Sequence, residues 1–303
     1  MKFEITILGS GSAVPTVRRN PSAQVVNINE NYSLIDCAEG TQMQMRKFGI
    51  SMLRIDQIYI SHLHGDHYLG LPGYLQTLHL LGRTRPIQLF GPADLMKLLE
   101  EHFRITHSIP RFEIKFTAVN HQVSTKLFEN KLYEVWSIPL KHKIATSGFL
   151  FREKPKLRNI IVSALKEYRI PVYWLQRIKE GSDYEQEDGT LVPNGEITLP
   201  PAPVKSYAYC SDTAYSEEIV HVIQGVNLLY HEASFLDQHA DRARETMHST
   251  AAEAAKIAAL AGVKRLLLGH FSARYRDTEE FIAQAKPFFE DTLTAEDGMA
   301  IVI

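Results

Sequence analysis

His62-Leu63-His64-Gly65-Asp66-His67 places three imidazoles and one carboxylate within six consecutive positions. So dense a set of metal-binding groups does not fit a core-packing pattern, whereas imidazole and carboxylate together suit zinc and related divalent ions. The preceding residues 57–61 are mostly β-branched or aromatic and predict a short buried strand, and the apolar residues 68–81 predict a helix. We therefore expect a metal site at the carboxyl end of a strand, where α/β proteins usually place their chemistry.

The bulk composition is that of an ordinary globular protein. The chain has 303 residues, of which 45% are hydrophobic and 22% charged, enough for one large core or two modest domains. No apolar run approaches the roughly 18 residues that a membrane span requires, and residues 1–5 lack the apolar segment of a signal peptide. The two cysteines, Cys37 and Cys210, argue against a secreted disulfide scaffold. We expect a cytoplasmic protein without a membrane partner.

Charge is distributed unevenly along the chain. Residues 141–180 contain ten Lys or Arg and three Glu, a local charge of +7, so the rest of the chain carries −9 within the overall formal charge of −2. This asymmetry indicates local contact with a polyanion. A solvated basic face is the alternative that charge alone leaves open.

Strand-like runs alternate with helical patterns along the whole chain. The expected strands cover residues 3–8, 23–28, 33–36, 58–61, 87–90, 113–117, 133–138, 147–151, 206–210, 227–231, 265–268 and 300–303. The expected helices cover about 39–48, 69–82, 93–104, 216–223, 249–261 and 278–290. Two sheets sandwiched between helices account for this alternation, because each set of strands is apolar enough to need covering. The expected fold class is therefore α/β.

Residues 153–205 stand apart from this alternation. Their first half is basic, and their second half is acidic and rich in glycine and proline. A stretch longer than about 15 residues between core strands usually has a function of its own. We expect an extruded arm inserted into a single domain of residues 1–303, and not a second domain.

Three lone residues beyond the histidine cluster share its placement. His142, Asp212 and His270 each come just after a predicted strand. Each alone is more often structural, but one ion takes about four ligands, so seven candidates suit two ions. Two neighbouring cations need a bridging carboxylate to offset their repulsion. Asp212 is the plausible bridge.

The motif His-x-His-x-Asp-His, followed by a lone His, a lone Asp and a final His, resembles the metallo-β-lactamase superfamily. Within it, the chain is similar to the ribonuclease Z family of tRNA 3′-processing endonucleases. The resemblance runs over nearly the whole chain and includes residues 9–20, 61–72, 210–213, 231–234, 248–250 and 270–275. It implies an αββα sandwich of two mixed sheets with an extruded arm.

The resemblance also implies two zinc ions per subunit. One is held by His62, His64 and His142, and the other by Asp66, His67 and His270, with Asp212 as the bridge. The implied activity is cleavage of precursor tRNA on the 3′ side of the discriminator nucleotide. It leaves a 3′-hydroxyl and uses a hydroxide that the two zinc ions activate.

Further residues receive roles in this chemistry. Asp66 can also act as the general base, and His248, oriented by Glu232, can protonate the departing 3′-oxygen. Arg274 is placed to hold the scissile phosphate, and the loop with Arg19 and Asn20 is expected to face the RNA backbone. A plain structural alternative exists for His248, because Thr250 and Glu253 form a capping-box pattern that could make residues 248–250 merely a helix start.

In the resembling family the arm grasps the tRNA elbow, often from the opposite subunit of a homodimer, so precursor tRNA and a second copy of this chain are the expected partners. Basic residues here interleave with Tyr168, Tyr173 and Trp174, which suit phosphate contacts and stacking. The tip departs from the family's Gly-Ile-Pro-x-Gly-Pro pattern, because residues 169–174 read Arg-Ile-Pro-Val-Tyr-Trp. Ser211 likewise precedes Asp212 where the family favours glycine.

Two other functions compete with this interpretation. Other hydrolases of the superfamily act on small phosphodiesters, sulfate esters or lactones, but they have no evident use for a basic arm or for Arg274. A metal-binding RNA-recognition module without catalysis is the second alternative. It is disfavoured because every candidate ligand and acid–base residue is present.

Overall fold

The computed structural model describes residues 2–303, and Met1 lies outside this range. The chain divides into two compact units. The larger unit runs as far as Arg152 and resumes at Lys205, and the smaller unit is Glu153–Val204. The smaller unit coincides with the segment that the sequence predicts as an arm. Across residues 2–303, no helix combines the length and the apolar character that a membrane crossing requires.

Seven strands form the first sheet of the larger unit, in the spatial order β20-β1-β3-β4-β5-β6-β7. Strands β20, β1, β3 and β4 pair antiparallel, whereas β4, β5, β6 and β7 run parallel. Because β1 is antiparallel to β3, it runs in the same direction as β4 to β7, so the carboxyl ends of five strands meet at one edge of this sheet. The strands are β1 Phe3–Gly9, β3 Ala23–Ile28, β4 Asn31–Ile35, β5 Ile55–Tyr59, β6 Ile87–Gly91, β7 Ile114–Ala118 and β20 Ala300–Val302.

The second sheet also has seven strands, in the order β19-β17-β16-β15-β10-β9-β8. Strands β15, β16, β17 and β19 are parallel, β10 is antiparallel to β15, and β8 is antiparallel to β9. Both sheets are thus mixed. The strands are β8 Lys126–Glu129, β9 Tyr133–Pro139, β10 Ser147–Glu153, β15 Ser206–Cys210, β16 Leu228–Glu232, β17 Leu266–Gly269 and β19 Thr292–Thr294.

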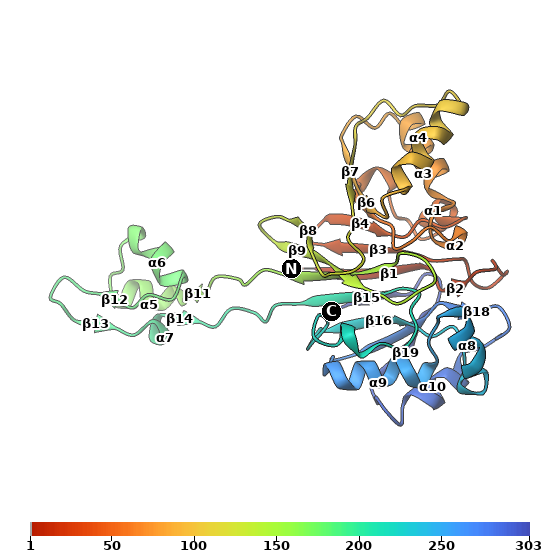
Figure 1. The fold of residues 1–303 in the computed structure, drawn as a ribbon. Coiled ribbons are helices and arrows are strands. Elements are labelled where there is room, and N and C mark those ends of the chain that lie inside the picture. Colours follow the sequence, from red (N-terminus) through yellow and green to blue (C-terminus); the bar gives the residue numbers. More distant parts are fainter. Residues whose placement is uncertain (1) are drawn as a thin grey trace. The chain divides into compact units, whose positions relative to one another are not determined.

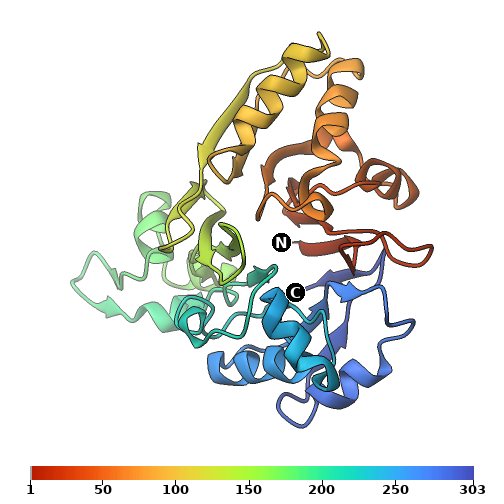
Figure 2. The same cartoon turned by 45° about the vertical axis from the view of Figure 1, so that its right-hand side comes forward.

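The two sheets pack face to face and helices cover their outer faces (Figures 1 and 2). Between the sheets, Tyr59 of β5 lies 5.2 and 5.3 Å, between ring centroids, from Phe149 and Phe151 of β10. Burial of such large aromatic and aliphatic side chains is the main force that holds the layers together. The first sheet is covered by α1 Thr41–Lys47, α3 Leu71–Leu80 and α4 Leu95–Ile105, and the second by α9 Ala251–Ala261 and α10 Glu279–Ala285.

The α/β sandwich of two mixed sheets confirms the expected fold class, with differences in detail. The predicted helix at 216–223 is only the 3₁₀ turn η3 Glu217–Ile219. The helix α8 Ala240–Thr246 was not predicted, because its sequence is polar and only Ala243 is buried. Strands β8 and β19 were missed as well. The expected strand at 57–61 is observed at Ile55–Tyr59, so it ends two residues earlier and Ser61 already belongs to the loop with the predicted ligands.

The smaller unit consists of short elements around a core of its own. Two-stranded pairs join β11 Asn159–Ile160 to β14 Thr198–Leu199 and β12 Tyr184–Glu185 to β13 Leu191–Val192. The helical segments are α5 Val162–Glu167, η2 Val172–Trp174, α6 Leu175–Lys179 and α7 Asn194–Ile197. Ile178 and Ile197 are fully buried, and Trp174 meets Tyr184 edge-on at 5.3 Å between ring centroids. The segment thus has a small apolar cluster that orders it locally.

Candidate active site and metal centre

The seven predicted ligands converge at the carboxyl ends of strands from both sheets. His62 and His64 lie in the loop after β5, and Asp66 and His67 lie in the short helix α2 Gly65–Tyr68 that follows. His142, Asp212 and His270 follow β9, β15 and β17. Their ligand atoms form adjoining groups, and within each group all atoms lie within 4.8 Å of one another. Residues up to 208 positions apart in sequence are thus brought together by the strand order.

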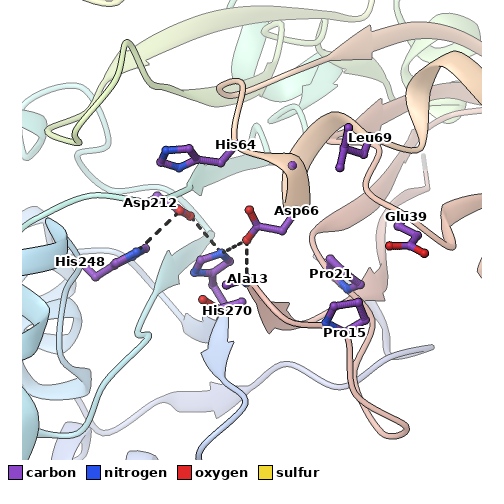
Figure 3. Close-up of a pocket in the computed structure, with 12 residues that line it drawn as sticks. Ala13, Pro15, Pro21, Glu39, His64, Asp66, Leu69, Asp212, His248 and His270 are labelled. Atoms are coloured by element: carbon purple, nitrogen blue, oxygen red, sulfur yellow. Dashed lines mark hydrogen bonds and ion pairs between the residues drawn. The ribbon is translucent and has the colours of Figure 1, made fainter.

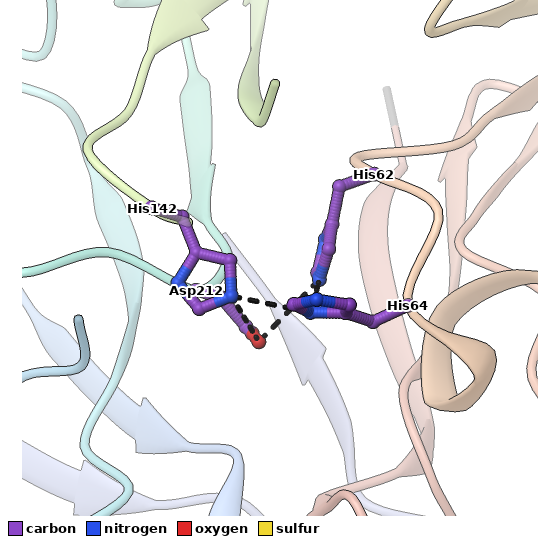
Figure 4. A group of neighbouring side chains, drawn as sticks. All are labelled: His62, His64, His142 and Asp212. Carbon is purple, nitrogen blue, oxygen red and sulfur yellow. Dashed lines mark hydrogen bonds and ion pairs between the residues drawn. The ribbon is translucent and has the colours of Figure 1, made fainter. Parts of the chain in front are cut away.

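The first group contains His62, His64, His142 and Asp212 (Figure 4). His64 Nδ1 lies 3.0 Å from His62 Nε2 and 3.2 Å from His142 Nε2. Asp212 Oδ2 lies 3.5 Å from His62 Nε2 and 3.8 Å from His142 Nε2. Three imidazole nitrogens and one carboxylate oxygen therefore face a common point.

The second group contains Asp66, His67 and His270. His67 Nε2 and His270 Nε2 are 3.3 Å apart, and Asp66 Oδ2 lies 3.5 and 3.4 Å from them. Asp212 Oδ1 completes this group at 3.3 Å from His67 Nε2 and 3.2 Å from His270 Nε2. The two oxygens of Asp212 thus face different groups, as a bridging carboxylate requires.

The outer nitrogens of these histidines are held by hydrogen bonds. His67 Nδ1 is 2.7 Å from Asp36 Oδ2, His142 Nδ1 is 2.9 Å from the Met247 carbonyl, and His270 Nδ1 is 2.9 Å from Ser234 Oγ. Such partners fix the ring and leave Nε2 to face inward, which is the usual arrangement around metal-bound histidine. The donor set of neutral nitrogen and carboxylate oxygen fits zinc. The residues present therefore fit divalent metal ions.

Burial and the carboxylates set the charges of the site. Burial lowers the pKa of His62 well below its usual value, and it lowers the pKa of His64 and His142 in the same direction, which favours the neutral rings that bind metals. At His67 burial opposes protonation, but Asp212, Asp36 and Asp66 outweigh it and raise the pKa well above its usual value. Such an excess of buried carboxylate makes the site attract positive charge.

His248 and Glu232 form a pair beside the two groups. His248 Nδ1 lies 2.8 Å from Glu232 Oε1, and Glu232 is fully buried. Burial acts to lower the pKa of His248, but Glu232 raises it to about 9. His248 Nε2 lies 3.9 Å from Asp212 Oδ2, and with Asp212 and His270 this histidine forms a third possible metal group. The capping box of Thr250 and Glu253 is also present, so the helix start and the His248–Glu232 pair coexist.

A cavity of about 400 Å³ opens onto these side chains (Figure 3). Five candidate site residues line it, namely His64, Asp66, Asp212, His248 and His270. The rest of the lining is Ser12, Ala13, Pro15, Pro21, Glu39, Gly65 and Leu69. These five candidate side chains are therefore accessible to a molecule bound in the cavity.

The predicted substrate-binding residues lie on two neighbouring loops. Arg274 is exposed, stacks over the Phe235 ring at 5.1 Å and donates from Nε to Ser272 Oγ. Arg19 donates to the Tyr275 carbonyl at 2.9 Å, and the Asn20 side chain donates to Asp297. Arg274 is thus free to meet a phosphate, whereas Arg19 and Asn20 already hold their own loop in place.

Sequence reasoning missed three groups that contact the ligands. Asp36 comes directly after β4, just as the predicted ligands come directly after their strands, so its place in the sequence could have indicated a role in the site. Its backbone is in the left-handed region, with φ at +54°. Ser234 bonds both Glu232 and His270. The Ala13 backbone N–H donates to Asp66 Oδ2 at 2.7 Å (Figure 3). A backbone donor has no side-chain signature, so no residue pattern could have indicated it.

Comparisons with known proteins are consistent with this geometry. A family model described as Anti-Pycsar protein Apyc1 matches residues 3–149. Ribonuclease Z of Parabacteroides distasonis is 43% identical over 99% of both chains, and that of Phocaeicola vulgatus is 44% identical over 100% of this chain and 98% of its own. Among solved structures, the short form of human tRNase Z is 27% identical, has a TM-score of 0.72 and covers 98% of both chains.

Another solved structure, the metallo-β-lactamase fold protein YhfI of Bacillus subtilis, has a TM-score of 0.70 at 17% identity over the full length of both chains, which shows the shared fold. The two ribonuclease Z relatives are much more similar, because their alignments reach 43% and 44% identity and cover 99% and 100% of this chain. By this full-length similarity, the chain belongs to the ribonuclease Z family within the metallo-β-lactamase fold.

Proposed function

We propose that this chain cleaves precursor tRNA on the 3′ side of the discriminator nucleotide, leaving a 3′-hydroxyl, with two zinc ions per subunit. The family membership carries the coarser statement that it is a metal-dependent endoribonuclease of tRNA 3′ processing. The finer proposal, cleavage after the discriminator nucleotide with two zinc ions, is supported by the convergence of seven side chains able to bind metal, with the His248–Glu232 pair beside them.

In the proposed site, His62, His64 and His142 would hold one zinc ion, and Asp66, His67 and His270 would hold the other. The two oxygens of Asp212 face the two groups, so Asp212 would serve both. When bound, a zinc pair lowers the pKa of water and stabilises negative charge on a phosphodiester. Hydrogen bonds to Asp36, the Met247 carbonyl and Ser234 fix the rings of His67, His142 and His270, in that order.

The acid–base steps belong to Asp66 and His248. Asp66 accepts the proton of the attacking water in this proposal, because its carboxylate lines the cavity. His248 donates the proton at Nε2 to the departing 3′-oxygen, since Nδ1 is bound to Glu232. Glu232 is a positioning residue in this proposal, because it is fully buried and contacts His248. Arg274 holds the scissile phosphate, and Arg19 and Asn20 present the loop that faces the RNA backbone.

The smaller unit Glu153–Val204 is proposed as the surface that binds the body of the tRNA. Its basic first half offers phosphate contacts, and Tyr173 in the turn η2 is 78% exposed and free to stack. From the family resemblance we also propose a cytoplasmic homodimer. Light scattering of the purified protein tests the dimer.

A small phosphodiester is the second candidate substrate. The 400 Å³ cavity is large enough for one, and the metal-binding groups alone do not require tRNA. The basic segment has no evident use for such a substrate, which is why we favour tRNA.

Metal analysis combined with cleavage of a 3′-extended tRNA tests the proposal. We expect two zinc ions per subunit and one cut after the discriminator nucleotide, mapped to the nucleotide. Rapid hydrolysis of a small phosphodiester without any cut in the tRNA would contradict it, as would protein that is active without transition metal.

A further inference from the structure

The carboxylate of Asp297 receives an unusual number of hydrogen bonds for a half-buried surface residue. Ser10 donates to Oδ1 from its backbone N–H at 3.0 Å and from Oγ at 2.8 Å. Asn20 donates to Oδ2 from its backbone N–H at 2.7 Å and from Nδ2 at 2.9 Å. Gln44 Nε2 adds a fifth bond to Oδ2, at 3.1 Å. One side chain therefore binds both ends of the segment that runs from Ser10 to Asn20.

Asp297 itself is fixed to the first sheet. It lies in the turn before β20, where Gly298 N–H donates to the Ile7 carbonyl and Ile7 N–H donates to the Met299 carbonyl. The base of the 10–20 loop is equally close-packed, since a Cβ at Gly9 would lie 1.7 Å from the Pro21 carbonyl oxygen. The loop is therefore closed at its base and held by a carboxylate that is anchored on β1.

The same loop reaches the metal centre at two places. The Ala13 N–H donates to Asp66 Oδ2 at 2.7 Å, on the oxygen that also faces His67 and His270 (Figure 3). At its start, the Ser10 carbonyl accepts from Phe271 N–H at 3.0 Å, and β2 Gly11–Ser12 pairs with β18 Phe271–Ser272. A shift of the loop would therefore move two things together: the Ala13 N–H that donates to Asp66, and the backbone next to His270.

We propose that Asp297 is a positioning residue for Asp66. By clamping both ends of the 10–20 loop, it holds the Ala13 N–H against the Asp66 carboxylate and so orients the oxygen that faces the metal groups. This role rests on the proposed function, because Asp66 is there both a metal ligand and the proton acceptor. Asp297 acts only through the loop and is about 280 residues away in sequence from the two ends that it holds.

Asp297→Asn tests this role, with Glu296→Gln as the matched control. Asn keeps the shape of Asp but replaces one acceptor oxygen by an amide donor, so either the Ser10 bonds or the Asn20 and Gln44 bonds are lost. Glu296 is the exposed neighbour, and its side chain has no hydrogen bond or ion pair among the contacts of residues 2–303. The control therefore removes the same charge without touching the clamp.

The first measurement is amide hydrogen exchange in the metal-free protein, which needs no activity. In Asp297→Asn we expect the amides of residues 10–20 to exchange about tenfold faster or more, and Glu296→Gln to match the unmodified protein. Unchanged exchange in Asp297→Asn would overturn the clamp. If that variant fails to fold, Ser10→Ala removes one of the five bonds and should show a smaller increase in the same segment.

The second measurement is hydrolysis of bis(p-nitrophenyl) phosphate by the zinc-loaded protein. We expect kcat to fall about tenfold in Asp297→Asn while KM changes less than about threefold, because a misplaced proton acceptor slows the chemical step. An unchanged kcat, or a rise in KM without a fall in kcat, would show that the loop does not act through Asp66. If the unmodified protein cleaves neither this ester nor tRNA, the proposed function fails, whereas the exchange measurement still decides the clamp.

Discussion

The metal centre and the smaller unit Glu153–Val204 differ in how their functional side chains are held. At the centre, His62 and His67 are fully buried and Asp212 is 2% exposed, and each has several partners. In the smaller unit, Val172 and Tyr173 are 82% and 78% exposed. Buried groups that share partners act as a unit, so losing one affects all, whereas exposed groups contribute separately. Single substitutions should therefore be severe at the centre and mild in the smaller unit.

Asp212→Ala should have the largest effect. Both groups lose a carboxylate oxygen, and the four predicted histidine ligands next to Asp212 lose their shared negative neighbour. We expect zinc content to drop from two ions to one or none, and cleavage of 3′-extended tRNA to fall about 10⁴-fold or more, as when one member of a catalytic unit is removed. Elemental analysis and single-turnover cleavage measure the two losses. Full zinc content with normal cleavage would show that the convergence is only structural.

His248→Ala should have the next largest effect and a different signature. Without the proton donor at Nε2, we expect tRNA cleavage to slow by about 10²- to 10³-fold. Zinc content should stay nearly unchanged, because the proposed ligand sets do not include His248. The same elemental analysis decides this point. A loss of zinc equal to that in Asp212→Ala would assign His248 to the third metal group instead of the acid–base pair.

These two substitutions test residues that the sequence could identify, and the reason is geometric. His62, His64, Asp66 and His67 stand together in one loop, so their density alone indicates a metal. Asp212 and His270 stand alone and become candidates only because each follows a strand, and parallel strands end at the same edge of a sheet. The two-sheet architecture was likewise predictable, since apolar strands and helices alternate along the chain.

Other parts of the site depend on tertiary contacts that leave no local pattern. The Ala13 N–H is a backbone group, and its position depends on Asp297 at the far end of the chain. Asp36 follows a strand as the predicted ligands do, which makes it a candidate, but its contact with His67 appears only once β4 lies beside β5. The mis-predicted helix at 216–223 has an apolar pattern, and yet only the single turn η3 forms there.

Deleting residues 154–201 should separate binding from chemistry. Arg152 of β10 and Ser206 of β15 are antiparallel neighbours, so residues 153 and 202–205 suffice as a turn between them. We expect kcat/KM for tRNA to fall about 10²-fold through loss of the basic contacts, and hydrolysis of bis(p-nitrophenyl) phosphate to stay within about twofold. The thermal midpoint of the larger unit serves as the control for folding. Equal losses on both substrates would remove the binding role of this segment.

Tyr173→Ala should have the smallest effect, and it is the sharpest test of the contrast between the metal centre and the smaller unit. Tyr173 lies in the exposed turn η2, where residues 169–174 depart from the family pattern. If its ring stacks on an unpaired base of the tRNA, its removal costs about 1 kcal/mol, which is roughly a fivefold rise in KM with kcat unchanged. Tyr168→Phe is the matched control, because it keeps the ring and removes only a hydroxyl that donates to Glu196 at 3.3 Å. A fall in kcat for Tyr173→Ala would mean that the tip influences the chemical step, and the division between a sensitive centre and a tolerant binding surface would then be wrong.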